Sequence, residues 1–279
     1  MIYLVSRNKS LFGSERYKQV PFEEAIALLL PLHLVQFDTE TKGLDAHTKE
    51  LLTVQLGCRE FQVVFDWTTM SKEEFATFMN AETAKIAKSG TYDLVRKSTY
   101  TRSINIGGAT DPINAIIKAI DENSSIDSVI GSFLGMGTTQ GKIPKDDINA
   151  NYKIKATSVR ESDLGSFNAS NGVYTFTLAN ASDPKKTNAT ALSRFTNDFI
   201  THEEVDAGIK DTAGSLITLK ETNVKYSNIK ATVKVVDGKI AEITYQYDFA
   251  ATLSLKILVG NVNGSGSAKT TGAFTNIAY

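Results

Sequence analysis

Two short dipeptides constrain the C-terminal three quarters of this 279-residue chain. Asn171-Gly172 and Asp237-Gly238 each separate segments in which apolar and polar residues alternate. Asx-Gly pairs favour the tight turns of β-hairpins, and a period of two is typical of half-buried strands. The strands are expected over 152–160, 172–178, 229–236, 240–249, 251–259 and 267–279, with 261–266 linking the last two. The sequence therefore predicts a long antiparallel sheet.

Helices are expected before and within this sheet. Ser71, followed three residues later by Glu74, matches a capping box and predicts a helix that runs to about residue 87. Asp111-Pro112 begins a second helix, in which isoleucines recur at helical spacing. Further helical segments are expected over 126–134 and 199–209. Helices followed by a long antiparallel meander indicate an α+β domain with a few helices.

The first 67 residues have a different pattern, strand, helix, strand and hairpin. The strands are expected over 2–5, 32–38, 51–57 and 60–66, with a helix over 22–30. The character of the sequence changes abruptly near 67–71, which predicts an α/β segment over 1–68 and an α+β domain over 69–279. A fusion of two unrelated sequences would also fit this change.

Composition narrows the classes of function. The net charge of −1 gives no overall attraction to a polyanion, and 42% hydrophobic residues predict a packed core. The single cysteine excludes an intramolecular disulfide and a cysteine metal cluster. The N-terminus lacks the pattern of a signal peptide, and no stretch has the roughly 18 consecutive apolar residues of a membrane helix. A cytoplasmic location is the default expectation.

Two carboxylates near the end of the 32–38 strand suggest metal chemistry. Asp38 and Glu40 are two residues apart, so an extended backbone places both side chains on one face. Carboxylate oxygens are the ligands that Mg²⁺ prefers. The alternative is that both residues are simply solvated.

The segment 35–45, with Asp38, Glu40 and the Gly43-Leu44 turn, resembles the first motif of DEDD-type 3′–5′ proofreading exonucleases, as in phage family A DNA polymerases. The resemblance implies a partial ribonuclease-H-like sheet. It also implies that Asp38 and Glu40 bind two catalytic Mg²⁺ or Mn²⁺ ions, and that Thr41 and Leu44 contact the end of a single-stranded nucleic acid. The later motifs have no clear counterpart, so the implied exonuclease module is incomplete. The positions to inspect for further carboxylates are Asp66, Asp93 and Asp206.

The C-terminal part supports a different hypothesis. Segments 193–201 and 224–279 weakly resemble uncharacterised secreted proteins of gut Firmicutes, which implies export and no particular activity. An antiparallel sheet with helices on one face could enclose an apolar ligand. The side chains expected on that face are Phe249, Leu253, Leu255, Ile257 and Val259, and an ordinary core face is the alternative. The second hypothesis is therefore a non-enzymatic binding module of secreted or surface type.

Overall fold

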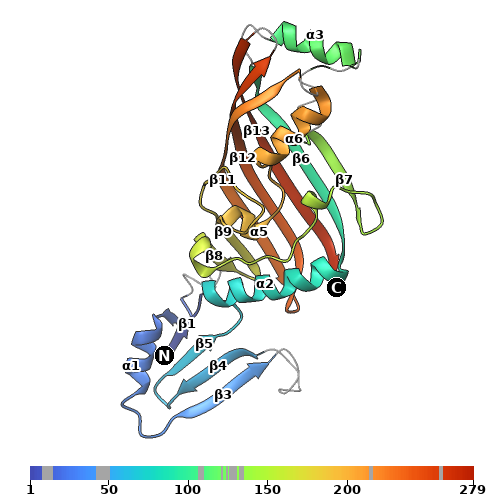
Figure 1. Cartoon of the computed structure of the whole chain (residues 1–279). Coiled ribbons are helices and arrows are strands. Elements are labelled where there is room, and N and C mark those ends of the chain that lie inside the picture. Colours follow the sequence, from blue (N-terminus) through green and yellow to red (C-terminus); the bar gives the residue numbers. More distant parts are fainter. Residues whose placement is uncertain are drawn as a thin grey trace.

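The protein consists of two β-sheets with a few helices (Figure 1). The computed structural model describes residues 1–7, 15–41, 51–105, 110–120, 122–123, 125, 131, 135–213, 216–257 and 260–279. The small sheet contains five strands and the large sheet eight. The chain passes from one sheet to the other between Asp66 and Thr91, through the helix α2 (Lys72–Ser89).

The small sheet has the strand order β2-β1-β5-β4-β3. Its elements are β1 (Ile2–Val5), β2 (Lys18–Gln19), α1 (Phe22–Leu29), β3 (Gln36–Thr41), β4 (Leu51–Gly57) and β5 (Gln62–Asp66). Strands β3, β4 and β5 pair antiparallel, which confirms the predicted hairpin, whereas β1 pairs in parallel with β5. One face of the sheet packs on α1 through Ala25, Leu29, Val63 and Phe65. In the strand order, β3 is at one edge of this sheet.

The large sheet has the order β7-β6-β13-β12-β11-β9-β8, with β10 also paired to β11. Its strands are β6 (Thr91–Asn105), β7 (Gly137–Ile143), β8 (Gly165–Ser170), β9 (Val173–Thr177), β10 (Ala181–Ser182), β11 (Thr218–Val236), β12 (Lys239–Ile257) and β13 (Gly260–Ala278). Each pairing between these strands is antiparallel. The prediction of a small α/β segment followed by a long antiparallel sheet is thus confirmed at this level.

Both predicted hairpin turns are present. Asn171 and Gly172 have φ of 49° and 71°, and Asp237 and Gly238 have φ of 53° and 71°. Positive φ at two consecutive residues is the geometry that the tight turn of a two-residue hairpin needs. These turns join β8 to β9 and β11 to β12.

The strands β11, β12 and β13 are longer than predicted, with 19 residues each. The polar segment 261–266 was expected to link two strands, but it lies within β13 and pairs with β12 from Asn261–Lys256 to Gly266–Ala251. Glycine and asparagine weaken a strand, but the continuous pairing with the long strand β12 supplies the hydrogen bonds that hold this segment.

The predicted strand over 152–160 is wrong. The described structure there is a short 3₁₀ turn, η3 (Ala150–Tyr152), followed by irregular backbone. Side chains of α2 satisfy this backbone: the Thr157 N–H donates to Thr83, and Asn80 bonds both the N–H and the carbonyl of Val159. Ser158 N–H donates to the carbonyl of Arg194. Side chains of the helix α2 therefore make the hydrogen bonds that a neighbouring strand would make to this segment.

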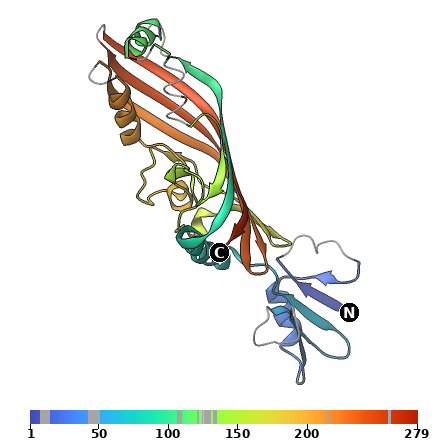
Figure 2. The same ribbon diagram turned by 90° about the vertical axis from the view of Figure 1, so that its right-hand side faces the viewer.

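The helices predicted after Ser71, from Asp111 and over 199–209 are present, the last one shifted to 202–213, whereas the segment 126–134 lies outside the described residues apart from residue 131. Ser71 caps α2 through Glu74, with both bonds of the predicted capping box present. The others are α3 (Thr110–Ile120), α5 (Ala191–Phe195), α6 (His202–Ala213) and a 3₁₀ turn η4 (Glu161–Asp163). Helices α5 and α6 lie on the same side of the large sheet, which we call the covered face (Figure 2). Among the described helices, none has the length and apolar character needed to cross a membrane.

Candidate ligand-binding site

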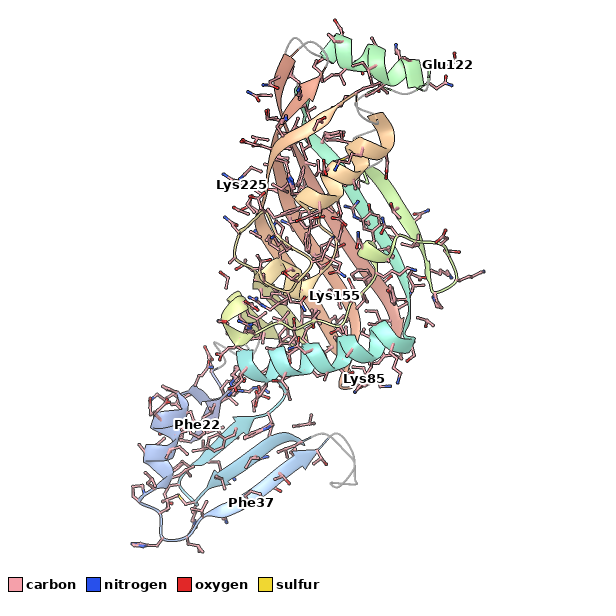
Figure 3. All side chains as sticks on the ribbon, viewed as in Figure 1. Phe22, Phe37, Lys85, Glu122, Lys155 and Lys225 are labelled. Atoms are coloured by element: carbon pink, nitrogen blue, oxygen red, sulfur yellow. The ribbon has the colours of Figure 1, made fainter. Side chains whose placement is uncertain are left out.

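The predicted carboxylate pair lies on the edge strand β3 of the small sheet. Asp38 and Glu40 alternate onto one face, and both are exposed to solvent. The Asp38 Oδ1 atom accepts a hydrogen bond from the neighbouring Thr39 N–H at 2.8 Å. Thr41 is half-buried at the end of the strand, and Leu44 lies outside the described residues. On the opposite face of the same strand, Phe37 is 69% exposed (Figure 3).

The further carboxylates do not gather around this pair. The strand register places Glu40, Thr53 and Asp66 in one row across β3, β4 and β5, so Asp66 is two strands, or about 10 Å, from Glu40. Asp66 also accepts hydrogen bonds from Ser6 and Thr68. Asp93 and Asp206 belong to β6 and α6 of the other sheet. Across the described part of the chain, no group of three or more His, Cys, Asp or Glu residues could hold a metal ion.

A cavity of about 320 Å³ lies on the covered face of the large sheet. The strands β6, β13, β12 and β11 form its floor, and the segments 135–152 and 198–204 form its walls. The floor side chains are Arg96, Ser98, Ala268, Thr270, Tyr247, Phe249 and Tyr226. The wall side chains are Met136, Asn149, Asn151, Tyr152, Asp198, Phe199, Ile200 and Glu204. The cavity thus combines aromatic surfaces with several polar groups.

A row of hydroxyl groups crosses the floor of the cavity. Ser98, Thr270 and Tyr247 are directly opposite one another on β6, β13 and β12. The Ser98 and Thr270 hydroxyl oxygens are 2.9 Å apart, and the Tyr247 hydroxyl is hydrogen-bonded to both Thr270 and Arg96. Burial raises the pKa of Tyr247, so its hydroxyl stays protonated at neutral pH. We call these three residues the hydroxyl row.

A buried ion pair closes one end of the cavity. Arg96 and Asp198 are 3% and 2% exposed, and the Arg96 Nε atom lies 3.0 and 2.9 Å from the two Asp198 oxygens. Tyr245 donates its hydroxyl to Asp198 at 2.5 Å. Burial alone would lower the pKa of Arg96, but the attraction and hydrogen bonds of Asp198 raise it above its ordinary value. Arg96 therefore keeps its positive charge beside the Asp198 carboxylate.

Arg96 joins the two walls to each other. While Nε holds Asp198, the Nη1 atom donates to the carbonyl of Gly135 at 2.7 Å, and the guanidinium lies 4.2 Å from the ring centre of Tyr152. Gly135 has φ of 59°, and a Cβ there would meet the Tyr152 hydroxyl at 2.1 Å. Only glycine gives both this backbone conformation and this close approach.

A second glycine positions the tyrosine that binds Asp198. Gly272 lies between Arg96 and Tyr245 in the strand register. A Cβ on Gly272 would lie 2.2 Å from the Cζ atom of Tyr245, so the tyrosine ring lies directly over the glycine. The ring can therefore cross β13 and bring its hydroxyl to Asp198.

The segment 198–200 is fastened to the sheet at a second point. The Ile200 N–H donates to the Tyr226 hydroxyl at 2.7 Å, and Phe199 meets the Tyr226 ring edge-on. Burial is the main cause that raises the pKa of Tyr226 far above its usual range, so its hydroxyl stays protonated and also donates to the Ile200 carbonyl at 3.3 Å. The walls are thus held by hydrogen bonds that are largely shielded from water.

The mouth of the cavity is more exposed. Asn149 is exposed, whereas Asn151 and Glu204 are half-buried. Asn151 donates to Glu204 at 3.2 Å, and the Lys186 ammonium lies 3.5 Å from the same carboxylate. Glu204 also completes a capping box with Thr201 at the start of α6.

No protein-family model matches this chain, and no curated protein or solved structure matches it. The site therefore rests on its own geometry.

Sequence reasoning found part of this face and missed the rest. Phe249, Leu255 and Ile257 are buried on the covered face as predicted, and Leu253 is half-buried there. Only Phe249 lines the cavity, because Leu255 and Ile257 pack in a separate cluster with α3 and α6. Val259 lies outside the described residues.

The missed signal is on β13. At alternate positions, this strand carries the small residues Gly264, Gly266, Ala268, Thr270 and Gly272. Small side chains along one face of a central strand leave space that larger neighbours enclose.

Proposed function

We propose that the large-sheet unit is a binding module that holds a small amphipathic organic molecule in the cavity on its covered face. The observation that carries this proposal is the cavity of about 320 Å³, whose floor carries the hydroxyl row and whose walls are fastened by Arg96 and Tyr226. Small-molecule sites are typically concave, about 300–1,000 Å³, and lined by apolar and aromatic side chains with a few placed polar groups.

The rigidity of the walls supports the proposal. A site that is ordered before binding avoids the entropy cost of ordering side chains around the ligand. The buried hydrogen bonds of Asp198 and Ile200 already fix their wall to the sheet. Aromatic rings of Tyr152, Tyr226 and Phe249 offer flat apolar surfaces beside this fixed polar end.

The test uses N-phenyl-naphthylamine, an uncharged aromatic probe that fluoresces in apolar surroundings. Ala268 lines the cavity and is 1% exposed, so Ala268→Leu directs extra methyl groups into the space. Ala250 is exposed on the other face, which makes Ala250→Leu the matched control. We expect saturable fluorescence with the unmodified chain and with Ala250→Leu, and loss of it with Ala268→Leu. Equal titrations for all three proteins would refute the proposal.

We propose a second function for the small sheet, divalent-metal binding by Asp38 and Glu40 as part of an exonuclease-like module. Two observations favour it: both carboxylates are on one face of β3, and β3, β4 and β5 follow one another as an antiparallel meander. This is the order expected for the first three strands of a ribonuclease-H-like sheet. Two ions held there would activate water and stabilise the leaving oxygen of a phosphodiester.

Calorimetry with Mn²⁺ or Mg²⁺ tests the second function. We expect saturable binding that Asp38→Ala abolishes, followed by degradation of a single-stranded DNA in the presence of the ion. Asp93→Ala is a suitable control, because its carboxylate lies on the other sheet, where it accepts a hydrogen bond from Asn276. Absence of binding to the unmodified chain would remove both the metal site and the nuclease.

A further inference from the structure

The charges around the cavity indicate which class of ligand fits it. Among the described lining residues, the ionisable groups that carry charge at neutral pH are Arg96, Asp198 and Glu204. Arg96 and Asp198 neutralise each other, and the carboxylate of Asp198 also accepts the Tyr245 hydroxyl. The guanidinium of Arg96 has further partners in the Gly135 carbonyl and the Tyr152 ring. Neither member of the pair is left to balance a charge on a ligand.

The carboxylate at the mouth is balanced as well. Glu204 accepts hydrogen bonds from Asn151 and from the Thr201 N–H, and Lys186 is 3.5 Å away. Lys186 itself donates to the carbonyls of Asn197 and Phe199, so its ammonium is held in this position. Burial lowers the pKa of Lys186 and the Glu204 carboxylate counteracts this shift, so the two groups act as a pair at the mouth.

The polar groups that remain are uncharged. Ser98, Thr270 and Tyr247 present hydroxyls that can both donate and accept, and Asn149 and Asn151 present amides at the mouth. A buried charge without a partner is strongly unfavourable, whereas a hydroxyl can join an existing hydroxyl row.

We propose that the ligand is an uncharged amphipath, with an alcohol-type polar group on the hydroxyl row of Ser98, Thr270 and Tyr247 and an apolar body against Tyr226 and Phe249. This inference rests on the proposed binding function and narrows it to one chemical class. It excludes carboxylic acids and amines in their ionised forms, even though an arginine and two carboxylates line the cavity.

A matched series of competitors tests the inference. Phenylbutanol, phenylbutylamine and phenylbutyrate share one body and differ in charge, and each is titrated against bound N-phenyl-naphthylamine at pH 8. We expect the alcohol to displace the probe about tenfold or more better than either ion. Displacement by the acid or the amine that equals or exceeds that of the alcohol would overturn the inference, and so would a failure of all three.

The pH dependence of the acid gives an independent readout. If only the protonated acid enters, its apparent affinity falls about tenfold for each pH unit between 6 and 8. If Arg96 recognises the carboxylate, the affinity stays level or rises with pH, which would also overturn the inference.

One variant tests the hydroxyl row directly. Thr270→Val keeps the shape of the side chain and removes its hydroxyl, so we expect it to weaken the binding of phenylbutanol more than the binding of N-phenyl-naphthylamine, both measured on the same variant. Unchanged displacement by the alcohol would contradict the assigned position. The separate measurement on Ala268→Leu tests the binding function itself. If Ala268→Leu loses probe binding while Thr270→Val leaves displacement by the alcohol unchanged, only the assigned position of the alcohol is wrong.

Discussion

The buried ion pair allows the sharpest test of how the covered face is held together. Arg96 and Asp198 are each at most 3% exposed, so removal of one partner leaves the other charged and without compensation in the interior. Breaking a buried pair in this way typically costs about 3–5 kcal/mol. A domain has about 5–15 kcal/mol of total stability. We therefore expect Asp198→Asn to consume a large part of the stability of the large sheet.

A double-mutant cycle separates the pair from its surroundings. We expect Arg96→Met alone to cost about as much as Asp198→Asn, because each substitution leaves the other member of the buried pair without its partner. The double variant should cost no more than either single variant, which corresponds to a coupling energy of at least about 3 kcal/mol. Tyr245→Phe, which removes one hydrogen bond to the charged carboxylate, should cost about 1.5–3 kcal/mol.

Urea unfolding followed by far-ultraviolet circular dichroism provides the measurement. The two sheets can unfold separately, so the analysis begins with a comparison of transitions seen by several probes. Lys18→Met is the control: the Lys18 Nζ atom is also 3.0 Å from Glu24 Oε1, but both side chains are exposed, so we expect little change in the free energy of unfolding. A cost below 1 kcal/mol for Asp198→Asn, or additive costs in the double variant, would refute the reasoning.

Three further variants probe other parts of the large unit. Gly272→Ala places a Cβ against the Tyr245 ring, so we expect a loss of about 1–3 kcal/mol in urea unfolding. Ser71→Ala removes the cap of α2 and should cost about 1 kcal/mol, whereas Ser89→Ala at the other end of the helix should change little. For Asp163, burial alone would raise the pKa, but the bidentate hydrogen bonds of Arg194 bring it below 3.8. The ionised Asp163 carboxylate therefore stabilises the fold fully well above pH 3.8, and this stabilisation is lost as the pH falls through the lower folded-state pKa. The melting curves of Asp163→Asn and of the unmodified chain should converge only in that acid range.

Local signals in the sequence predicted the local structure well. The capping box of Ser71 and Glu74 and the turns at Gly172 and Gly238 depend on neighbouring residues alone, and each is present. The segment 152–160 was mispredicted because its alternating pattern is the same whether strands or the side chains of α2 satisfy its backbone. Which of the two partners the backbone of this segment finds depends on residues more than 70 positions earlier, and a local pattern carries no information about them.

The candidate cavity shows the same limit more strongly. Its floor combines Ser98 with Thr270, and its closed end combines Arg96 with Asp198, pairs that are far apart in the chain. Strand register brings Ser98 and Thr270 together, and the register of β13 depends on pairing with both β6 and β12. Asp198 reaches Arg96 from the irregular segment between α5 and α6. The alternating small residues of β13 indicate that space is available, but only the fold shows which larger side chains surround it.

The two candidate sites differ in how far they are organised before a ligand arrives. Asp38 and Glu40 project into water from an edge strand, where a cation must order both side chains and compete with their hydration. The cavity has walls that Arg96 and Tyr226 already fasten, so the ligand meets a shape that exists without it. Pre-organisation is therefore the physical reason to rank the cavity first. The sites also lie on separate sheets, so Asp38→Ala should leave probe binding intact, and Ala268→Leu should leave metal binding intact. Among the described residues the two sheets have separate hydrophobic cores, so a ligand effect that crossed between the sheets would require a coupling outside these cores.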